Sequence, residues 1–508
     1  MKRFITSMIL IVVAITAGAI RPIAITIYNT PKQTITGFGA ACCDGAMCPF
    51  AKDTKPVELL YGPESKIGLN IMRMEISPNF VGDVRVPEWG NWDTPYDWNG
   101  SLPSAKIVKQ RGGIVFGTPW SPPGDYKTNG TAQGGNAEDQ GYQEGRLRED
   151  CYKKFFPWLN TFLQWMKDNG VEVDAVSIQN EPDWWVSYSG CLYEPAEQVN
   201  LVKNYAYLLD REAYNGVRII SAEPLGFRQD YFDALLNDET CRKQVDIFAG
   251  HIYGHMPLDY IKPVAKKALP LGKEVWMTEH SVNSDALPTW AEQLIFAEEL
   301  NECMLAGCTG YIYWYMRAHW AFVGTGETKY GAENKKNVLL PRAYVMSHFS
   351  KYVTGSTRLE TSRDDDGGRE KEEKAADYEY SAYIKDNKVI VMAINATEND
   401  RELKIKLPFK VKSGIIVQSL GNEAENLCQQ KDIVIDEPIT DVIVELPYQS
   451  LNTYILTLDE STAIEGVRQT GDGAKTYYDL HGRKINNPRG LCIERSADGT
   501  LRKVIMKR

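Results

Sequence analysis

The stretch Ala175-Val-Ser-Ile-Gln-Asn-Glu-Pro-Asp183 passes within a few positions from an apolar run into polar residues. Such a run is typical of a buried parallel strand, and its polar end marks the place where a functional loop begins. The pattern occurs eight times in the first two thirds of the chain. The predicted strands are Phe38–Cys42, Ile71–Ile76, Ile114–Thr118, Ala175–Gln179, Arg218–Ala222, Ile247–Tyr253, Glu274–Thr278 and Tyr311–Met316.

The segments between these strands have helical apolar spacing, as in Phe155, Leu159, Phe162 and Met166. Eight strands alternating with helices predict a (β/α)8 TIM barrel over residues 36–353. A doubly wound open sheet is the alternative, and it is less favoured because no Gly-rich phosphate motif follows a strand.

The parts on either side of the predicted barrel have a different character. Runs of alternating apolar and polar residues in 354–460 predict an antiparallel β-sandwich side domain, to which a strand within residues 20–35 contributes. Residues 461–508 are predicted to form a C-terminal β-hairpin-like tail, a possible sorting element.

The chain starts with Lys2 and Arg3, followed by the apolar run Phe4–Ala17 and then small residues. This order is that of a secretory signal peptide, which we assign to residues 1–19. A retained anchor or a buried strand is the alternative. No other segment reaches the roughly 18 apolar residues of a membrane span. We therefore expect a secreted, periplasmic or cell-surface protein without a membrane span.

The composition narrows the class of function. The chain has 508 residues and a formal charge of −10, which argues against a nucleic-acid partner. All 12 tryptophans lie between Trp89 and Trp320, which indicates either two unlike domains or an aromatic-lined site in the first of them. The ten cysteines show no metal-binding spacing, so no metal is expected. Neither a Walker motif nor a dinucleotide-binding motif is apparent, so no other cofactor is expected. We expect a monomer.

Two carboxylates, Glu181 and Glu279, lie at the carboxyl ends of the fourth and seventh predicted strands. Catalytic groups of TIM barrels lie at these strand ends. Hydrolysis of a glycosidic bond uses two carboxyl groups, and a retaining mechanism needs them about 5–5.5 Å apart. A single glutamate here would more often be a surface or salt-bridged residue, whereas two among aromatic residues indicate a glycosidase. Glu223 is predicted to be a structural or subsite hydrogen-bonding residue.

Other residues at the same strand ends are predicted to bind the substrate. Asn180 can hydrogen-bond a sugar hydroxyl, and Tyr253 can orient the attacking carboxylate. The remaining candidates are the aromatic platforms Trp120, Trp184, Trp185 and Trp320, together with Arg73, His251 and Arg317.

These residues lie in motifs through which the chain resembles family 30 of the glycoside hydrolases, and most closely its bacterial glucuronoxylanase branch, subfamily eight. The motifs follow in family order over residues 22–458. They are Gln33–Gly39, Gly68–Met74, Ile114–Pro123, Val176–Asp183, His251–Gly254, Trp276–His280, Tyr313–Arg317 and Met346–Lys351.

The resemblance implies a barrel with a side β-domain built from both chain ends, Glu181 as acid/base and Glu279 as nucleophile. Glucuronoxylanases of this family carry two consecutive arginines after the eighth strand, and here Arg317 is followed by Ala318. The expected function is that of a secreted retaining endo-β-1,4-xylanase that cuts glucuronoxylan or a related decorated xylan by double displacement. The alternatives are another family 30 β-glycanase, such as an endo-β-1,6-glucanase or a β-1,6-galactanase, and a catalytically inactive carbohydrate-binding barrel.

Overall fold

A computed structural model shows two compact units, Met1–Thr457 and Leu458–Arg508. The structure describes residues 22–43, 53–78, 98–134, 144–281, 288–317, 321–327, 334–364 and 378–459, and the backbone of four short strands within 476–506. The predicted signal peptide therefore lies outside the described residues. Among the described residues, no helix combines the length and apolar character needed to cross a bilayer.

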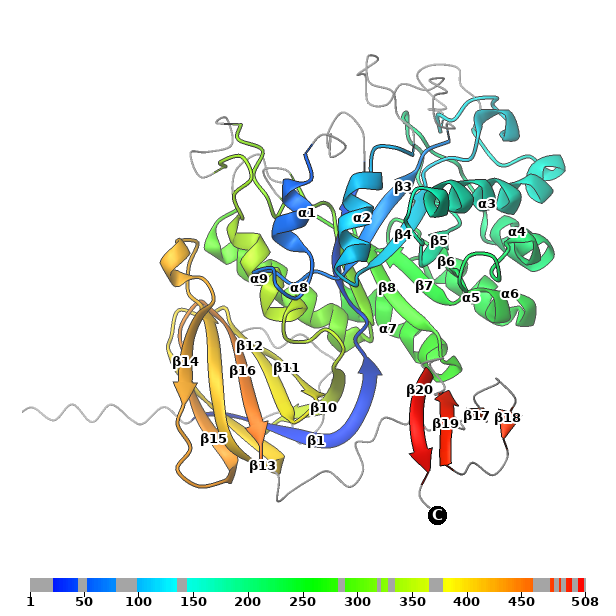
Figure 1. Cartoon of the computed structure of the whole chain (residues 1–508). Coiled ribbons are helices and arrows are strands. Elements are labelled where there is room, and N and C mark those ends of the chain that lie inside the picture. The colour runs from blue at the N-terminus through cyan, green and yellow to red at the C-terminus, as the bar shows by residue number, and fades with distance from the viewer. Residues whose placement is uncertain are drawn as a thin grey trace, which may run out of the picture. The chain divides into compact units, whose positions relative to one another are not determined.

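The first unit contains a closed parallel barrel, which confirms the predicted TIM barrel (Figure 1). The eight strands pair in chain order, and the last pairs with the first. They are β2 (Gly37–Cys42), β3 (Ile71–Ile76), β4 (Ile114–Pro119), β5 (Ala175–Ser177), β6 (Arg218–Ala222), β7 (Ile247–His251), β8 (Glu274–Glu279) and β9 (Gly310–Tyr313). A cluster of fully buried side chains, among them Ile71, Phe116 and Trp276, packs in this sheet.

Three strands end earlier than the sequence predicts. β5 stops at Ser177 instead of Gln179, β7 at His251 instead of Tyr253, and β9 at Tyr313 instead of Met316. Beyond β5 the backbone leaves the ladder, because the N–H of Asn180 donates to the carbonyl of Pro119. The polar residues that follow the strand are thereby positioned by neighbouring strand ends.

Helices cover the outside of the barrel because each carries one apolar face. In α3 (Tyr152–Asp168), the residues Phe155, Leu159, Phe162 and Met166 are buried, as their spacing predicts. The other helices are α1 (Lys55–Leu60), α2 (Leu102–Gln110), α4 (Pro195–Tyr205), α5 (Gln229–Asn237), α6 (Glu239–Gln244), α7 (Pro257–Ala268), α8 (Trp290–Ala306) and α9 (Pro341–Ser350).

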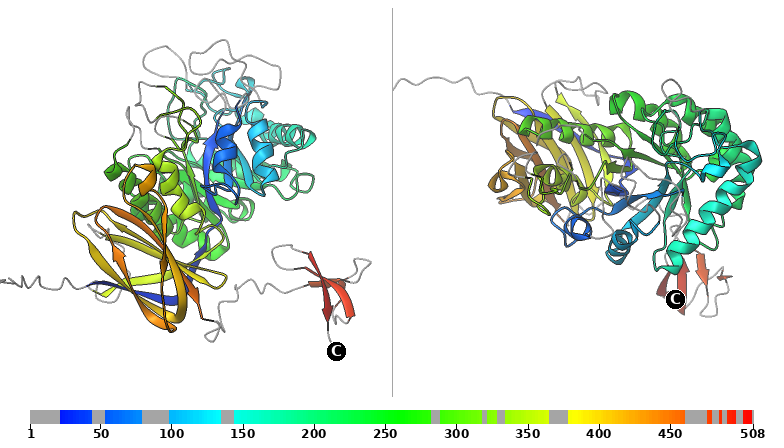
Figure 2. Two further views of the ribbon diagram at one scale, coloured as in Figure 1. Left: turned by 60° about the vertical axis from the view of Figure 1, so that its left-hand side comes forward. Right: turned by 90° about the horizontal axis from the view of Figure 1, so that it is seen from above.

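The side domain is one hydrogen-bonded sheet that closes on itself, next to the barrel helices α8 and α9 (Figures 1 and 2). Its order is β1-β10-β11-β12-β16-β13-β14, with β15 on β13 and a parallel pairing of β1 with β13. The strands are β1 (Ile23–Thr34), β10 (Thr357–Arg363), β11 (Tyr378–Lys385), β12 (Lys388–Asn395), β13 (Arg401–Ser419), β14 (Gln429–Ile433), β15 (Ile439–Leu446) and β16 (Ser450–Leu458).

A buried histidine joins the barrel to the side domain. His348 of α9 is fully buried, and its ring nitrogens lie 2.8 Å from the hydroxyl of Thr453 in β16 and 2.9 Å from that of Ser419 in β13. Burial lowers the pKa of His348 from 6.5 to about 3. The ring is therefore neutral and bonded to two hydroxyl groups.

The second unit holds a four-stranded antiparallel sheet in the order β18-β17-β19-β20. Strands β19 (Gly490–Arg495) and β20 (Leu501–Met506) pair side by side, and β17 (Thr476–Tyr478) and β18 (Lys484–Ile485) extend this pair. The tail thus has two more strands than the hairpin that the sequence predicts.

Candidate active site

The carboxyl ends of β5, β6 and β7 are tied together by main-chain hydrogen bonds. The N–H of Glu181 donates to the carbonyl of Glu223 at 3.0 Å, and the N–H of Glu223 donates to that of Ala249 at 2.8 Å. Glu181 and Glu223 both have a left-handed backbone, with φ of 44° and 54°. Such conformations cost about 1–3 kcal/mol and cluster at functional sites, where surrounding contacts hold them.

Glu279 is the last residue of β8, and the residue is 6% exposed. Arg73 of β3 donates from Nη1 to its Oε2, and the hydroxyl of Tyr253 donates to its Oε1 at 3.1 Å. A guanidinium and a phenol on the same carboxylate fix its orientation. The structure therefore presents Glu279 as an oriented carboxylate at the barrel mouth.

Glu181 lies next to Glu279 in a different environment. One carboxylate oxygen of each lies within 4.8 Å of the other, together with a ring nitrogen of His251. Burial, and after it the charge of Glu279, raise the pKa of Glu181, whereas the hydrogen bond from His251 Nδ1 at 2.9 Å opposes the rise. When two adjacent carboxyl groups have different partners, their pKa values move apart, so that one can act as an acid while the other stays ionised.

Glu223 is the fixed negative charge beneath this pair. It is fully buried, accepts hydrogen bonds from Ser177 and from Thr118 at 3.1 Å, and pairs with Arg73 at 3.3 Å. Burial alone would raise its pKa, but the charges of Arg73 and His251 lower the pKa of Glu223 to about 2. Glu223 is a hydrogen-bonding residue, as predicted, and it also balances two buried cations.

His251 ends β7 and is fully buried. Burial alone would lower its pKa, but the charge of Glu279 and the hydrogen bond to Glu181 raise the pKa of His251 to about 9. A protonated imidazole has no lone pair for a metal. Glu181, His251 and Glu279 are close enough together to hold an ion, but this protonation and the guanidinium of Arg73 oppose a cation there.

The predicted aromatic platforms differ in exposure. Trp184 and Trp185 lie three and four residues after Glu181 and are 52% and 48% exposed, so their rings are accessible for stacking. Trp120 is almost buried, with the Arg73 guanidinium 4.7 Å from its ring and Trp314 at 5.8 Å. Trp320 lies outside the described residues.

Two polar candidates are already bound within the protein. The Oδ1 of Asn180 accepts from Arg73 Nη2 at 2.7 Å, which fixes the amide at the mouth. Arg317 is 8% exposed, and its Nη1 donates to Asp53 at 2.9 Å. Its charge therefore has a carboxylate partner in the protein.

The sequence prediction missed the partnership of Arg73 with Glu223, and it missed Trp314 as a neighbour of Trp120. The sequence did contain a sign of a buried charge at Glu223, because its hydrogen-bond donors Ser177 and Thr118 are polar residues within otherwise apolar barrel strands. Polar residues at such positions indicate a buried charge nearby.

Comparison with known proteins agrees with this geometry. A family profile described as a glycosyl hydrolase catalytic core matches residues 150–306. Glucuronoxylanase XynC of Bacillus subtilis is 26% identical over 436 residues, which cover 84% of this chain and 90% of that protein. An endo-1,6-beta-D-glucanase of Neurospora crassa is 28% identical over 178 residues, which cover 31% of this chain and 36% of that protein.

Among solved structures, a family 30 subfamily 8 xylanase of Clostridium acetobutylicum superposes with a TM-score of 0.69 at 29% identity, over 85% of this chain and 99% of that one. The fold, the paired carboxylates at its mouth and these similarities together indicate a glycoside hydrolase that resembles family 30 and, within it, the subfamily 8 xylanases.

Proposed function

We propose that the chain is a secreted, monomeric endo-β-1,4-xylanase that cleaves decorated xylan with retention of anomeric configuration. The observation that carries retention is the approach of Glu181 and Glu279 to within 4.8 Å. Retaining glycosidases place these groups about 5–5.5 Å apart, and inverting ones place them about 6.5–9.5 Å apart to admit a water molecule.

In the first step, the Glu279 carboxylate attacks the anomeric carbon while Glu181 gives its proton to the departing glycosidic oxygen. The C–O bond to the leaving sugar breaks as the bond to Glu279 forms, which yields a covalent glycosyl-enzyme. In the second step, Glu181 takes a proton from water, the water oxygen bonds to the anomeric carbon, and Glu279 leaves as a carboxylate. Arg73 and Tyr253 hold Glu279 in position for both steps.

The similarity to XynC and to a subfamily 8 xylanase over most of the chain supports xylan as the substrate. The pairing of Arg317 with Asp53 is relevant to whether the enzyme requires the glucuronate branch of the xylan. Because the guanidinium already has a carboxylate partner, we infer that cleavage does not require a glucuronate on the xylan. The partial similarity to an endo-1,6-glucanase keeps β-1,6-glucan as the second candidate substrate.

The test is incubation with glucuronoxylan, arabinoxylan, linear xylooligosaccharides and β-1,6-glucan, followed by mass spectrometry of the products. The proposal expects cleavage of linear xylooligosaccharides at a rate comparable with that on glucuronoxylan. Products that all carry one glucuronate would contradict the inference on Arg317. Cleavage of β-1,6-glucan alone would show that β-1,6-glucan, and not xylan, is the substrate.

Retention is tested by NMR of the anomeric proton in the first minutes of reaction, before mutarotation. The β-anomer is expected first, and an α-anomer would contradict the double displacement. Glu279→Gln is expected to abolish turnover while the protein still binds the polymer. Export is tested by expression of the full chain and sequencing of the mature N-terminus, which is expected to follow residue 19.

A further inference from the structure

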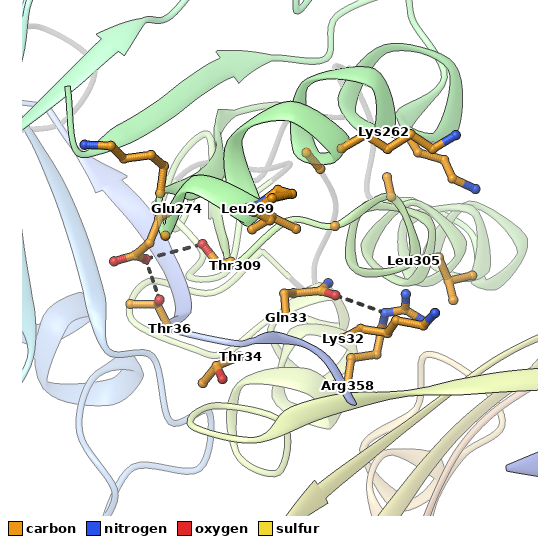
Figure 3. A pocket seen from close by; sticks show the side chains of 17 residues that line it. Lys32, Gln33, Thr34, Thr36, Lys262, Leu269, Glu274, Leu305, Thr309 and Arg358 are labelled. Carbon is orange, nitrogen blue, oxygen red and sulfur yellow. Dashed lines mark hydrogen bonds between the residues drawn. The ribbon is translucent and has the colours of Figure 1, made fainter. Parts of the chain in front are cut away.

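Strand β8 is fixed at its start and carries the nucleophile at its end. At the start, the Glu274 carboxylate accepts hydrogen bonds from Thr36 and Thr309 on the wall of a cavity (Figure 3). Glu279 is the last residue of the strand, and His280 follows it. His280 is also the last residue of one of the family motifs, and the two chemical steps give it no part. Its contacts show what it can do.

The ring of His280 is held from the neighbouring helix. Its Nδ1 lies 2.8 Å and 2.7 Å from the two carboxylate oxygens of Glu299 in α8. The hydroxyl of Tyr311 in β9 donates to the same carboxylate at 2.6 Å. Because an ionised carboxylate only accepts, Nδ1 carries the hydrogen in this contact. The side chains of His280 and Glu299 are 17% and 14% exposed, so a turn of the ring would deprive a mostly buried acceptor of a donor.

The backbone of His280 is held separately from its ring. The N–H of Trp314 donates to the carbonyl of His280 at 2.9 Å. A substitution of the His280 side chain keeps this bond, and it keeps the contacts of Glu274 at the other end of β8. The effect of such a substitution is therefore limited to what the ring itself contacts.

The ring of His280 packs against Tyr253, the residue whose hydroxyl donates to Glu279. The two ring centroids are 4.9 Å apart, and the ring planes are inclined by 59°. The ring of His251 also contacts Tyr253, at 6.2 Å and 78°. Both separations lie within the range of favourable ring pairs, about 4.5–7 Å. The side chain of Ser281 adds a hydrogen bond to the phenol. His280 is thus one of several groups that hold Tyr253, and its ring is the nearer of the two imidazoles.

The hydrogen bond from Tyr253 contributes unequally to the two chemical steps. Glu279 loses its negative charge as it bonds to the anomeric carbon, and it regains the charge as it leaves. A hydrogen bond to its carboxylate therefore weakens toward the first transition state and strengthens toward the second. Correct placement of the phenol matters most for the breakdown of the glycosyl-enzyme.

We propose that His280 is a positioning residue for this second step. Its ring, held by Glu299, keeps the Tyr253 phenol directed at Glu279 while Glu279 leaves the anomeric carbon. The inference deepens the proposed function and rests on its double displacement, but it does not depend on which linkage is cut.

The experiment measures burst and steady-state kinetics on 2,4-dinitrophenyl β-xylobioside. The dinitrophenolate leaves without a proton from Glu181, so breakdown of the glycosyl-enzyme limits turnover. His280→Ala should lower kcat about fivefold, the size of one ring pair, and should lower KM by the same factor. The value of kcat/KM and the rate of the dinitrophenolate burst should stay parental, because both report the first step.

A double-variant cycle tests whether His280 acts through the phenol. Tyr253→Phe keeps the ring and removes the hydroxyl, and addition of His280→Ala to it should lower kcat no further. His280→Asn keeps a donor toward Glu299 without the ring, so it should reproduce the kinetics of His280→Ala even if the alanine variant folds poorly. The matched control is His255→Ala, which removes a different ring pair, 4.0 Å from Tyr260, and should leave kcat and KM parental.

Two results would overturn the inference. One is a fall in kcat/KM as large as the fall in kcat, which would indicate a general distortion of the site. The other is a full additional loss when His280→Ala is combined with Tyr253→Phe.

The choice of substrate separates this inference from the proposed activity. If the parent protein cleaves 2,4-dinitrophenyl β-gentiobioside and not the xylobioside, the proposed substrate fails, and the same comparison on the gentiobioside decides the role of His280. A parent protein that gives no burst on either substrate would contradict the double displacement, and this inference with it.

Discussion

His251 at the mouth of the barrel and His348 at its junction with the side domain are both fully buried, yet their pKa values move in opposite directions. His251 is surrounded by three carboxylates and has a pKa of about 9, whereas His348 meets two hydroxyl groups and has a pKa of about 3. Burial disfavours the charged ring in both places. At the mouth of the barrel, neighbouring carboxylates offset the cost of burying a charged ring, whereas the two hydroxyl groups at the junction do not.

The opposite pKa shifts of the two histidines distinguish a charged network at the active site from a neutral contact that joins the barrel to the side domain. At the mouth, the positive charges of Arg73 and His251 offset the negative charges of Glu223 and Glu279. The buried site therefore has no net charge when Glu181, the partner of His251, keeps its proton. At the junction, a neutral ring satisfies Thr453 and Ser419 without any charge.

Removal of Arg73 is the most severe way to break the charged network. Arg73→Met leaves Glu223 and Glu279 buried without their cation, and loss of one member of a buried ion pair costs about 3–5 kcal/mol. We expect that loss in urea unfolding, together with loss of turnover. The control Lys243→Met removes an exposed pair with Glu239 and should cost less than about 1 kcal/mol. Equal costs for the two variants would mean that the network contributes no special stability.

His251→Gln tests whether the charge on the ring tunes Glu181. Loss of the cation removes an influence that lowers the pKa of Glu181, so the alkaline limb of the kcat/KM profile should move to higher pH. Because Glu181 also loses its orienting partner, kcat should fall about a hundredfold, the size expected for a small misplacement. An unchanged alkaline limb would show that Glu181 does not set it.

His348→Gln tests the neutral contact. The variant is expected to lose about 1–3 kcal/mol of unfolding free energy at pH 7, because a hydroxyl at the junction loses its partner. This deficit should shrink below pH 6.5, since glutamine does not titrate. Turnover on short substrates should stay at the parental level. Loss of activity without loss of stability would contradict the division between mouth and junction.

The smallest expected effect is the pH dependence of the stability of the unmodified protein. The pKa of His348 is lower in the folded state than the usual 6.5, so its contribution to stability declines as pH falls from 6.5 toward 3. The pKa of His251 is raised, so its contribution is complete below 6.5 and declines as pH rises through 9. The melting temperature should fall on both sides of neutrality. His348→Gln should flatten the acid side and His251→Gln the alkaline side.

The sequence predicted the barrel well because its strands are continuous apolar runs. The bounds of Ile71–Ile76 and Arg218–Ala222 agree with β3 and β6. It overran β5, β7 and β9, since Ile178, Ile252 and Met316 are as apolar as the strands they follow while the ladder of hydrogen bonds ends before them. The paired glutamates could be located because they follow strands of one barrel. Partners such as Arg73 with Glu223 depend on side-chain directions across the barrel, which spacing along the chain does not encode.

The pairing of β1 has a consequence for the order of folding during synthesis. Ile23 of β1 lies beside Leu403 of β13 in parallel register, and β1 also pairs with β10. Strand β1 thus has no complete set of neighbours until nearly four hundred further residues have left the ribosome. Domains whose segments are contiguous can fold as they emerge. Here β1 is made long before the strands with which it pairs, so its hydrogen-bonding edges stay unpaired while the barrel is synthesised.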